Sequence, residues 1–181
     1  MQRDEILRSY GTDYKNMTKA LLEAGGAAAD IRFKCGLASQ GDKAGNANVS
    51  LAGAQDGLSS RRRLRIGIKP NLVCPTPADF GGTTHPEIVA GIIEYLTEHG
   101  FGPDEIEILE GSWVGDRTED AFEYCGYNSL SLKYGVQLRD MQKEHETISC
   151  NCTGLSLNIC SHALDFDYLV NVPVIKGHCQ T

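Results

Sequence analysis

Aliphatic runs alternate with segments of helical periodicity between residues 64 and 172, and this alternation is the strongest constraint on the fold. Strands are predicted where aliphatic side chains alternate or run together, at residues 64–68, 105–109, 136–138 and 168–172. Helices are predicted where apolar residues recur every three or four positions, at residues 14–24, 85–99, 118–125 and 129–134. The pattern therefore predicts an α/β fold: a mostly parallel sheet with helices on both faces, three-layered and Rossmann-like.

Two local patterns refine this prediction. Residues 147–152 and 155–160 are predicted to form a β-hairpin, because Thr153-Gly154 between them is a short turn sequence. Thr84 and Glu87 have the spacing of a capping box, in which the hydroxyl and the carboxylate each bind a free backbone N–H at a helix start.

The chain divides by composition near residue 63. Residues 1–63 are predicted to contain one helix followed by a long loop or insertion, because residues 27–60 are rich in Gly, Ala, Ser, Asn and Asp and show no strong period. A short strand is predicted within that loop at Ile31–Cys35. Residues 64–181 form the predicted α/β domain.

Charge and hydropathy exclude several classes of partner. The net charge of -7 argues against a general nucleic-acid or membrane-surface protein, because phosphate groups repel an acidic chain. No apolar run approaches the about 20 residues that span a bilayer, and residues 1–14 lack the apolar core of an export signal. We therefore expect a cytoplasmic protein that binds neither nucleic acid nor membrane.

The seven cysteines are an odd number, and without an export signal free thiols are expected. Cys150 and Cys152 are the only close pair, and strand alternation places both on one face. The two cysteines could serve as metal ligands or as a redox pair. The alternative is that they pack as small hydrophobic residues. Two ligands alone do not complete a metal site.

Polar residues gather at the predicted ends of the strands. In open α/β sheets, ligands bind beyond the carboxyl ends of the strands, where helix N-termini also point. The polar residues predicted at these positions are Lys69, Asn71, Thr84, His85, Glu110, Ser112, Asn171, Lys176 and His178. Together they suit a small anionic molecule as the ligand.

Five of these residues are candidate catalytic residues. Lys69 and Lys176 can bind carboxylate or phosphate as point charges. His85 and His178 can transfer protons or ligate a metal, and Glu110 can act as a general base or bind a hard metal ion. The candidate ligand-binding residues are Asn71, Thr84, Ser112 and Asn171.

Each catalytic candidate also has a simpler interpretation. Lys69 fits a solvated lysine at a strand end, His85 a helix cap, and Glu110 an ordinary strand-to-helix turn. His178 lies close to the end of the sequence, where side chains are often poorly ordered.

Five motifs, in this order, resemble the domain-of-unknown-function 362 family. They are IGIKPNLV (66–73), TTHPE (83–87), EGS (110–112), FEYCGY (122–127) and NVPVIKGH (171–178). The resemblance covers about residues 64–181. It implies uncharacterised prokaryotic proteins of the cytosol, often described as iron–sulfur cluster binding, and it brings no established reaction.

The sequence departs from that family in two ways. It lacks the ferredoxin-type cysteine run, and it stops at residue 181, where members of the family normally continue. We therefore expect the N-terminal part of a longer protein. The expected cofactor is a metal ion or a 4Fe–4S cluster, although the motif for the cluster is absent from this chain.

Three functions remain open at this point. The first is an enzyme, or the N-terminal part of one, that binds a small anionic substrate, with or without a metal. The second is an iron–sulfur redox or electron-transfer protein. The third is a non-catalytic binding or assembly domain, including a homo-oligomer, with residues 27–60 as the contact.

Overall fold

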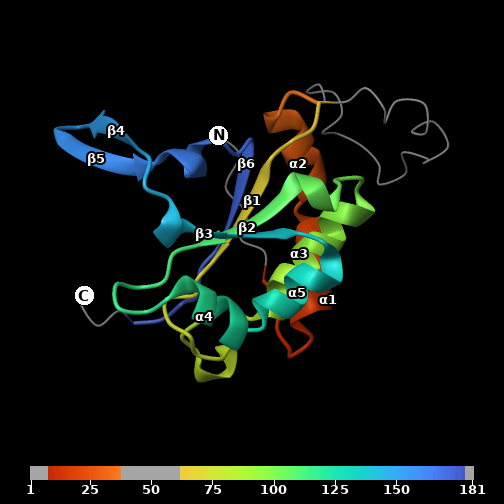
Figure 1. The fold of residues 1–181 in the computed structure, drawn as a ribbon. Coiled ribbons are helices and arrows are strands. Elements are labelled where there is room, and N and C mark those ends of the chain that lie inside the picture. Colours follow the sequence, from red (N-terminus) through yellow and green to blue (C-terminus); the bar gives the residue numbers. More distant parts are fainter. Residues whose placement is uncertain (1–7, 38–61, 178–181) are drawn as a thin grey trace.

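The computed structural model of the protein describes residues 8–37 and 62–177, and its centre is a parallel sheet (Figure 1). The sheet has four strands in the order β3-β2-β1-β6. Their bounds are Ile66–Pro70 for β1, Ile106–Glu110 for β2, Gln137–Asp140 for β3 and Tyr168–Val172 for β6. The α/β class and the parallel sheet are confirmed.

Helices connect and flank these strands. The α-helices are α1 (Tyr14–Ala24), α2 (Ala27–Lys34), α3 (Pro86–Glu98), α4 (Thr118–Tyr124) and α5 (Tyr127–Tyr134). The short 3₁₀ helices are η3 (Ala78–Phe80), η4 (Pro103–Glu105), η5 (Met141–Lys143) and η6 (Ser161–Leu164). Among the residues that the structure describes, no helix has both the length and the apolar character needed to cross a membrane.

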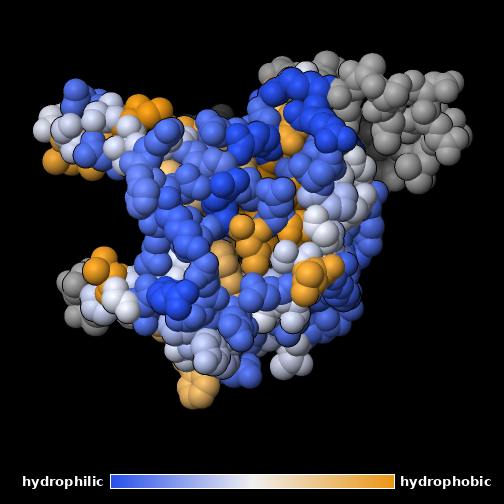
Figure 2. Space-filling model, viewed as in Figure 1, coloured by the Kyte–Doolittle hydropathy of each residue, from blue (hydrophilic) through white to orange (hydrophobic). Residues whose placement is uncertain are grey.

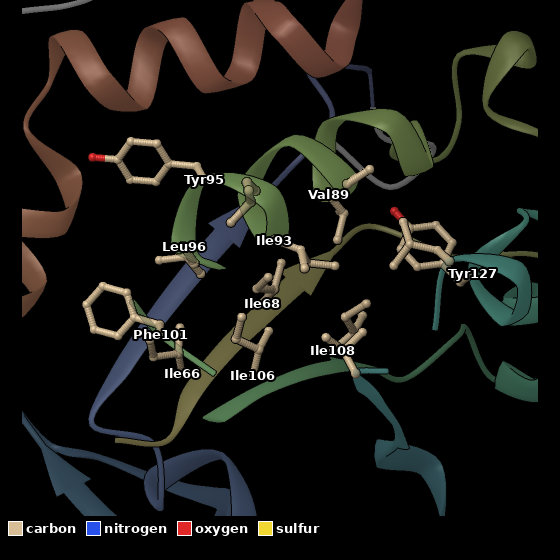
Figure 3. Packing of buried hydrophobic residues seen from close by; sticks show 14 of the residues in the cluster. Ile66, Ile68, Val89, Ile93, Tyr95, Leu96, Phe101, Ile106, Ile108 and Tyr127 are labelled. Carbon is tan, nitrogen blue, oxygen red and sulfur yellow. The ribbon is translucent and has the colours of Figure 1, made fainter. Parts of the chain in front are cut away.

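The core lies between the sheet and α3 (Figure 3). Ile66 and Ile68 of β1, with Ile106 and Ile108 of β2, alternate onto this face and are at most 2% exposed. The Tyr127 ring from α5 closes the same cluster near the carboxyl ends of the strands. This face is therefore held by aliphatic packing.

The second face of the sheet has a different cover. From β1 the chain steps across the sheet to β2 and then to β3, with its connecting helices on the α3 face. The connection from β3 back to β6 runs in the opposite direction, so a right-handed connection places it on the other face of the sheet. Among the described residues, this connection contains η5, the hairpin and η6, and no α-helix. This segment approaches the sheet closely at Gly67, where an added Cβ would lie 3.1 Å from Cδ1 of Phe166.

The hairpin is confirmed at its predicted bounds. Strands β4 (Thr147–Cys152) and β5 (Leu155–Cys160) pair antiparallel. Thr153 and Gly154 have φ angles of 46° and 87°, the positive values that a two-residue type I′ turn requires.

The predicted strand at Ile31–Cys35 is wrong, because α2 runs through most of it. Ala28 and Ile31 lie one turn apart, are 3% and 2% exposed, and belong to the core. The Ala28 N–H also donates to the Tyr95 hydroxyl at 3.0 Å. Tertiary packing thus selects a helix where the local pattern is weak. The rest of the predicted loop, from residue 38, lies outside the described residues.

Helix α1 packs closely on α3. A Cβ added at Gly91 of α3 would lie 2.6 Å from the Lys15 carbonyl oxygen, so glycine permits the two helices to approach. Lys15 also forms an ion pair of 3.1 Å with Glu94 of α3. The helices of the N-terminal segment therefore form an outer layer over the α3 side of the sheet (Figure 1).

Candidate functional site

Lys69 and Glu110 form an ion pair where β1 and β2 end. The Glu110 side chain is 5% exposed, and that of Lys69 is 43% exposed. The second carboxylate oxygen of Glu110 accepts the Leu72 N–H at 3.1 Å. Both oxygens are therefore engaged, and the pair fixes the loop that follows β1 while offsetting the cost of burying the carboxylate.

Lys176 crosses from the segment after β6 to the loops after β1 and before α3. Its Nζ donates to Asn71 Oδ1 at 3.3 Å and to the Gly82 carbonyl oxygen at 2.6 Å. Both of these partners are neutral oxygens. They hold the ammonium in place without cancelling its charge.

Thr84 connects three elements instead of capping α3. Its hydroxyl accepts the Asn71 N–H at 2.9 Å and donates to the Val172 carbonyl oxygen at 2.8 Å. The Tyr127 hydroxyl donates to the Thr84 carbonyl oxygen at 3.1 Å, and burial raises the pKa of Tyr127, so this donor stays protonated. The predicted capping box is wrong, since the hydroxyl is committed to the ends of β1 and β6.

His85 is the N-cap residue of α3, and its side chain makes no capping hydrogen bond. Its ring lies 4.3 Å from the Tyr14 ring, centroid to centroid. Its Nδ1 lies 3.8 Å from a carboxylate oxygen of Glu87, and the side chain is 24% exposed. Helix α1 thus supplies Tyr14, an aromatic neighbour that the sequence analysis missed because nothing local links positions 71 residues apart.

Ser112 is buried and supports the backbone. Its hydroxyl donates to the Leu72 carbonyl oxygen at 2.8 Å, and its N–H donates to Thr118 Oγ1 at 3.1 Å. Gln142, which the sequence analysis missed, accepts from the Thr118 hydroxyl at 2.9 Å and donates to the Ser112 carbonyl oxygen at 2.9 Å. A carboxamide can donate and accept at the same time, but no sequence motif marks this residue.

Asn171 lies directly beside Lys69 in the β1–β6 ladder and is exposed. Neighbouring residues of paired strands share a face, so the amide and the ammonium border the same region. His178, the remaining catalytic candidate, lies outside the described residues.

The structure therefore places the candidates in three contact groups at the carboxyl edge of the sheet. Lys69 pairs with Glu110, and Lys176 binds Asn71, whose N–H reaches Thr84. These two groups adjoin through the loop after β1. His85 follows Thr84 in the chain, but its ring contacts are with Tyr14 and Glu87 rather than with either lysine.

Two hollows lie beside the sheet. A hollow of about 660 Å³ lies between α4 and β3, and another of about 230 Å³ lies between α2, α3 and β6. In the larger one the charges pair with one another, as Lys143 does with Glu119 and Arg139 with Glu144. The smaller one is mainly apolar and shares only Asn171 with the candidate residues. Among the described residues Lys176 has only neutral partners, which makes the open edge the better candidate site.

The described cysteines are dispersed. Cys35 follows α2, Cys74 and Cys125 lie near the carboxyl edge, and Cys150 and Cys160 lie in the hairpin. Cys125 Sγ donates to the Thr76 carbonyl oxygen at 3.1 Å, and burial raises the pKa of this thiol.

A 4Fe–4S cluster requires four cysteine thiolates. Within residues 8–37 and 62–177, no group of three or more His, Cys, Asp or Glu side chains is placed to hold a metal ion. The described residues therefore do not fit a cluster. The metal prediction for Cys150 and Cys152 stays a prediction.

Comparison with known proteins gives one match. The model of a family described as a domain of unknown function, DUF362, matches residues 66–181. The chain belongs to the DUF362 family. The match begins at the first residue of β1 and includes every candidate site residue, so the resemblance in the motifs is confirmed. No curated protein and no solved structure matches the chain.

Proposed function

We propose that this DUF362 protein is an enzyme, or the part of one, that binds a small molecule carrying a carboxylate or phosphate group at the carboxyl edge of its sheet. The observation that carries the proposal is the environment of Lys176. Its ammonium is held by Asn71 Oδ1 and the Gly82 carbonyl oxygen, both neutral. A positive charge that no carboxylate of the described residues neutralises favours an anion at this edge.

The contrast with Lys69 supports this assignment. Lys69 is neutralised by Glu110, whose other oxygen holds the Leu72 N–H. We therefore assign the Lys69–Glu110 pair to positioning the loop that carries Asn71, and Lys176 to contact with the ligand. A metal ion at Glu110 would have to displace Lys69, so metal binding is not part of this proposal.

The start of α3 adds a second attraction for an anion. The helix has 13 residues and begins after His85, whose side chain does not cap it. Pro86 has no N–H and the Ile88 N–H donates to the His85 carbonyl oxygen at 3.1 Å, so the Glu87 N–H and the helix dipole are what this terminus offers a negatively charged group. His85 is the proton-transfer group in this scheme, and Tyr14 and Glu87 orient its ring.

The test compares two lysine substitutions of equal charge. Lys176→Gln removes the proposed ligand contact. Lys133→Gln removes an exposed lysine in the last turn of α5, at the opposite end of that helix from Tyr127. We expect Lys176→Gln to weaken binding of inorganic phosphate or citrate about tenfold, the usual effect of losing one charge-assisted hydrogen bond. Lys133→Gln should bind as the wild type does, because it lies away from the edge.

Titration calorimetry and amide chemical shifts would measure this binding. The proposal predicts that the amides whose chemical shifts change on binding belong to the loop after β1 and the first turn of α3. Equal weakening by both variants would mean that only overall charge matters, and unchanged binding in Lys176→Gln would reject the site.

A further inference from the structure

Hairpin β4–β5 stands apart from the body of the molecule (Figure 1). Its strands contact each other and, at the base, η6. Most of its described side chains are exposed. A lone two-stranded hairpin is only marginally stable in water, so an arm of this kind needs further contacts to hold its shape.

The two faces of the hairpin differ sharply in chemistry. Ile148 is opposite Ile159 and Cys150 is opposite Leu157, so these apolar side chains share one face with Leu155. Their exposed fractions reach 48% for Ile148, 50% for Leu157 and 64% for Leu155. Figure 2 shows apolar residues on this arm at the upper left.

The opposite face is polar. Ser149 is opposite Asn158, and Asn151 is opposite Ser156. The Ser149 hydroxyl also donates to Asn158 Oδ1 at 2.7 Å. This alternation is the pattern of a sheet with one solvated face and one covered face.

The chemistry of the apolar face restricts what can cover it. Residues 147–160 contain no charged residue, although the whole chain carries a net charge of -7. A charged partner would gain no ion pair here, and the lack of lysine and arginine disfavours an anionic membrane surface. The strands also lack the lysine and proline that usually prevent strand edges from pairing.

An identical apolar face satisfies these conditions. Two copies of an acidic chain can meet at an uncharged arm without bringing like charges together. An apolar surface is also complementary to itself, as a two-fold interface requires. Two such faces can stack as the sheets of a sandwich do.

We propose that two copies of this chain dimerise by packing the apolar faces of their β4–β5 hairpins against each other. The dimer buries Ile148, Leu155 and Leu157 of both copies and leaves the Ser and Asn face in solvent. The proposal does not depend on the ligand site, which lies at the carboxyl edge of the sheet.

The experiment uses two neighbouring positions that point to opposite faces of β5. Leu157→Glu puts a charge on the apolar face, whereas Asn158→Glu puts the same charge on the polar face. We expect Leu157→Glu to raise the dimer dissociation constant about 100-fold or more, because each dimer loses two buried leucines. Asn158→Glu should leave it within a few-fold of the wild type.

Sedimentation velocity over a range of concentrations measures the dissociation constant, and Leu155→Glu repeats the test at a second exposed position. Circular dichroism checks that each variant is folded. A wild type that remains monomeric overturns the proposal, whether its hairpin is covered by the same chain, by another protein or by lipid vesicles. A dimer that both glutamate variants on the apolar face leave intact overturns it as well.

Discussion

The two faces of the central sheet are built from the same strands and differ in how many charges they bury. On the α3 side, Ile66, Ile68 and Ile108 are fully buried among aliphatic neighbours. On the other side, the alternate positions in β1 and β2 include Gly67 and Glu107, which are Cα partners in the ladder. One face is therefore held by apolar burial alone, whereas the other combines an apolar residue, Leu109, that is 2% exposed with paired charges.

The charges of the second face centre on Glu107, whose side chain is 12% exposed. Its carboxylate accepts from Arg139 Nε at 2.6 Å and lies 3.7 Å from Arg65 Nη2. His162 Nε2 of η6 lies 3.4 Å from the same group. A buried carboxylate needs such partners, because an unpaired charge costs several kcal/mol in this environment.

Because of this difference, we expect different substitutions to destabilise the two faces. Loss of side-chain volume should damage the α3 face most. Loss of a single charge should damage the second face, whereas exposed apolar residues on that face should tolerate truncation.

The largest effect is expected on the aliphatic face. Ile108→Ala removes a side chain that is 0% exposed and should lower the free energy of unfolding by about 3 kcal/mol. Leu169→Ala on the second face, where the residue is 46% exposed, should cost less than about 1 kcal/mol. Urea unfolding of both variants measures the difference, and equal costs would remove the contrast between the faces.

An intermediate effect is expected for the charges. Arg139→Met leaves Glu107 without its nearest partner and should cost about 1–2 kcal/mol, less than for a fully buried pair because Arg139 is 35% exposed. Arg117→Met, at a pair where the arginine is 70% exposed, should change stability by less than about 0.5 kcal/mol. The same unfolding experiment in low and high salt would show whether the Arg139 contribution resists screening, as a partly buried pair should.

The smallest effect is expected from an ion pair on the helical side. The Tyr134 hydroxyl and Lys15 hold the pKa of Glu94 below its ordinary 4.5. Because the folded-state pKa is the lower one, the stabilisation is present above pH 4.5 and is lost as the pH falls through the folded value. Glu94→Gln should therefore lower stability by about 1 kcal/mol or less at neutral pH, since the group is partly exposed.

The stability difference between wild type and Glu94→Gln should shrink as the pH falls below 4.5. Unfolding free energies at several pH values measure it. Glu98→Gln is the matched control, because Glu98 also faces a lysine of α1 but is 57% exposed. If the stability difference between wild type and Glu94→Gln stayed constant down to acidic pH, the lowered pKa of Glu94 would not be the source of the stabilisation.

Much of the fold could be predicted because its signals are local. Alternation and helical periodicity located the strands of the sheet, and a two-residue turn located the hairpin. Helix α2 was missed, because its reason to form is the burial of Ala28 and Ile31 against α3. The second face was predicted to carry helices, and among the described residues its cover is the short η6 with charged partners.

The sequence by itself determined the α/β class, the family and the presence of polar residues at the strand ends, because each depends on neighbours within a few positions. Only the tertiary structure decided that Lys69 pairs with a carboxylate, whereas Lys176 has neutral partners among the described residues. Lys69 meets Glu110 41 positions away, and Lys176 meets Asn71 105 positions away. Pairings at such separations arise from strand order and loop packing, which no local pattern encodes.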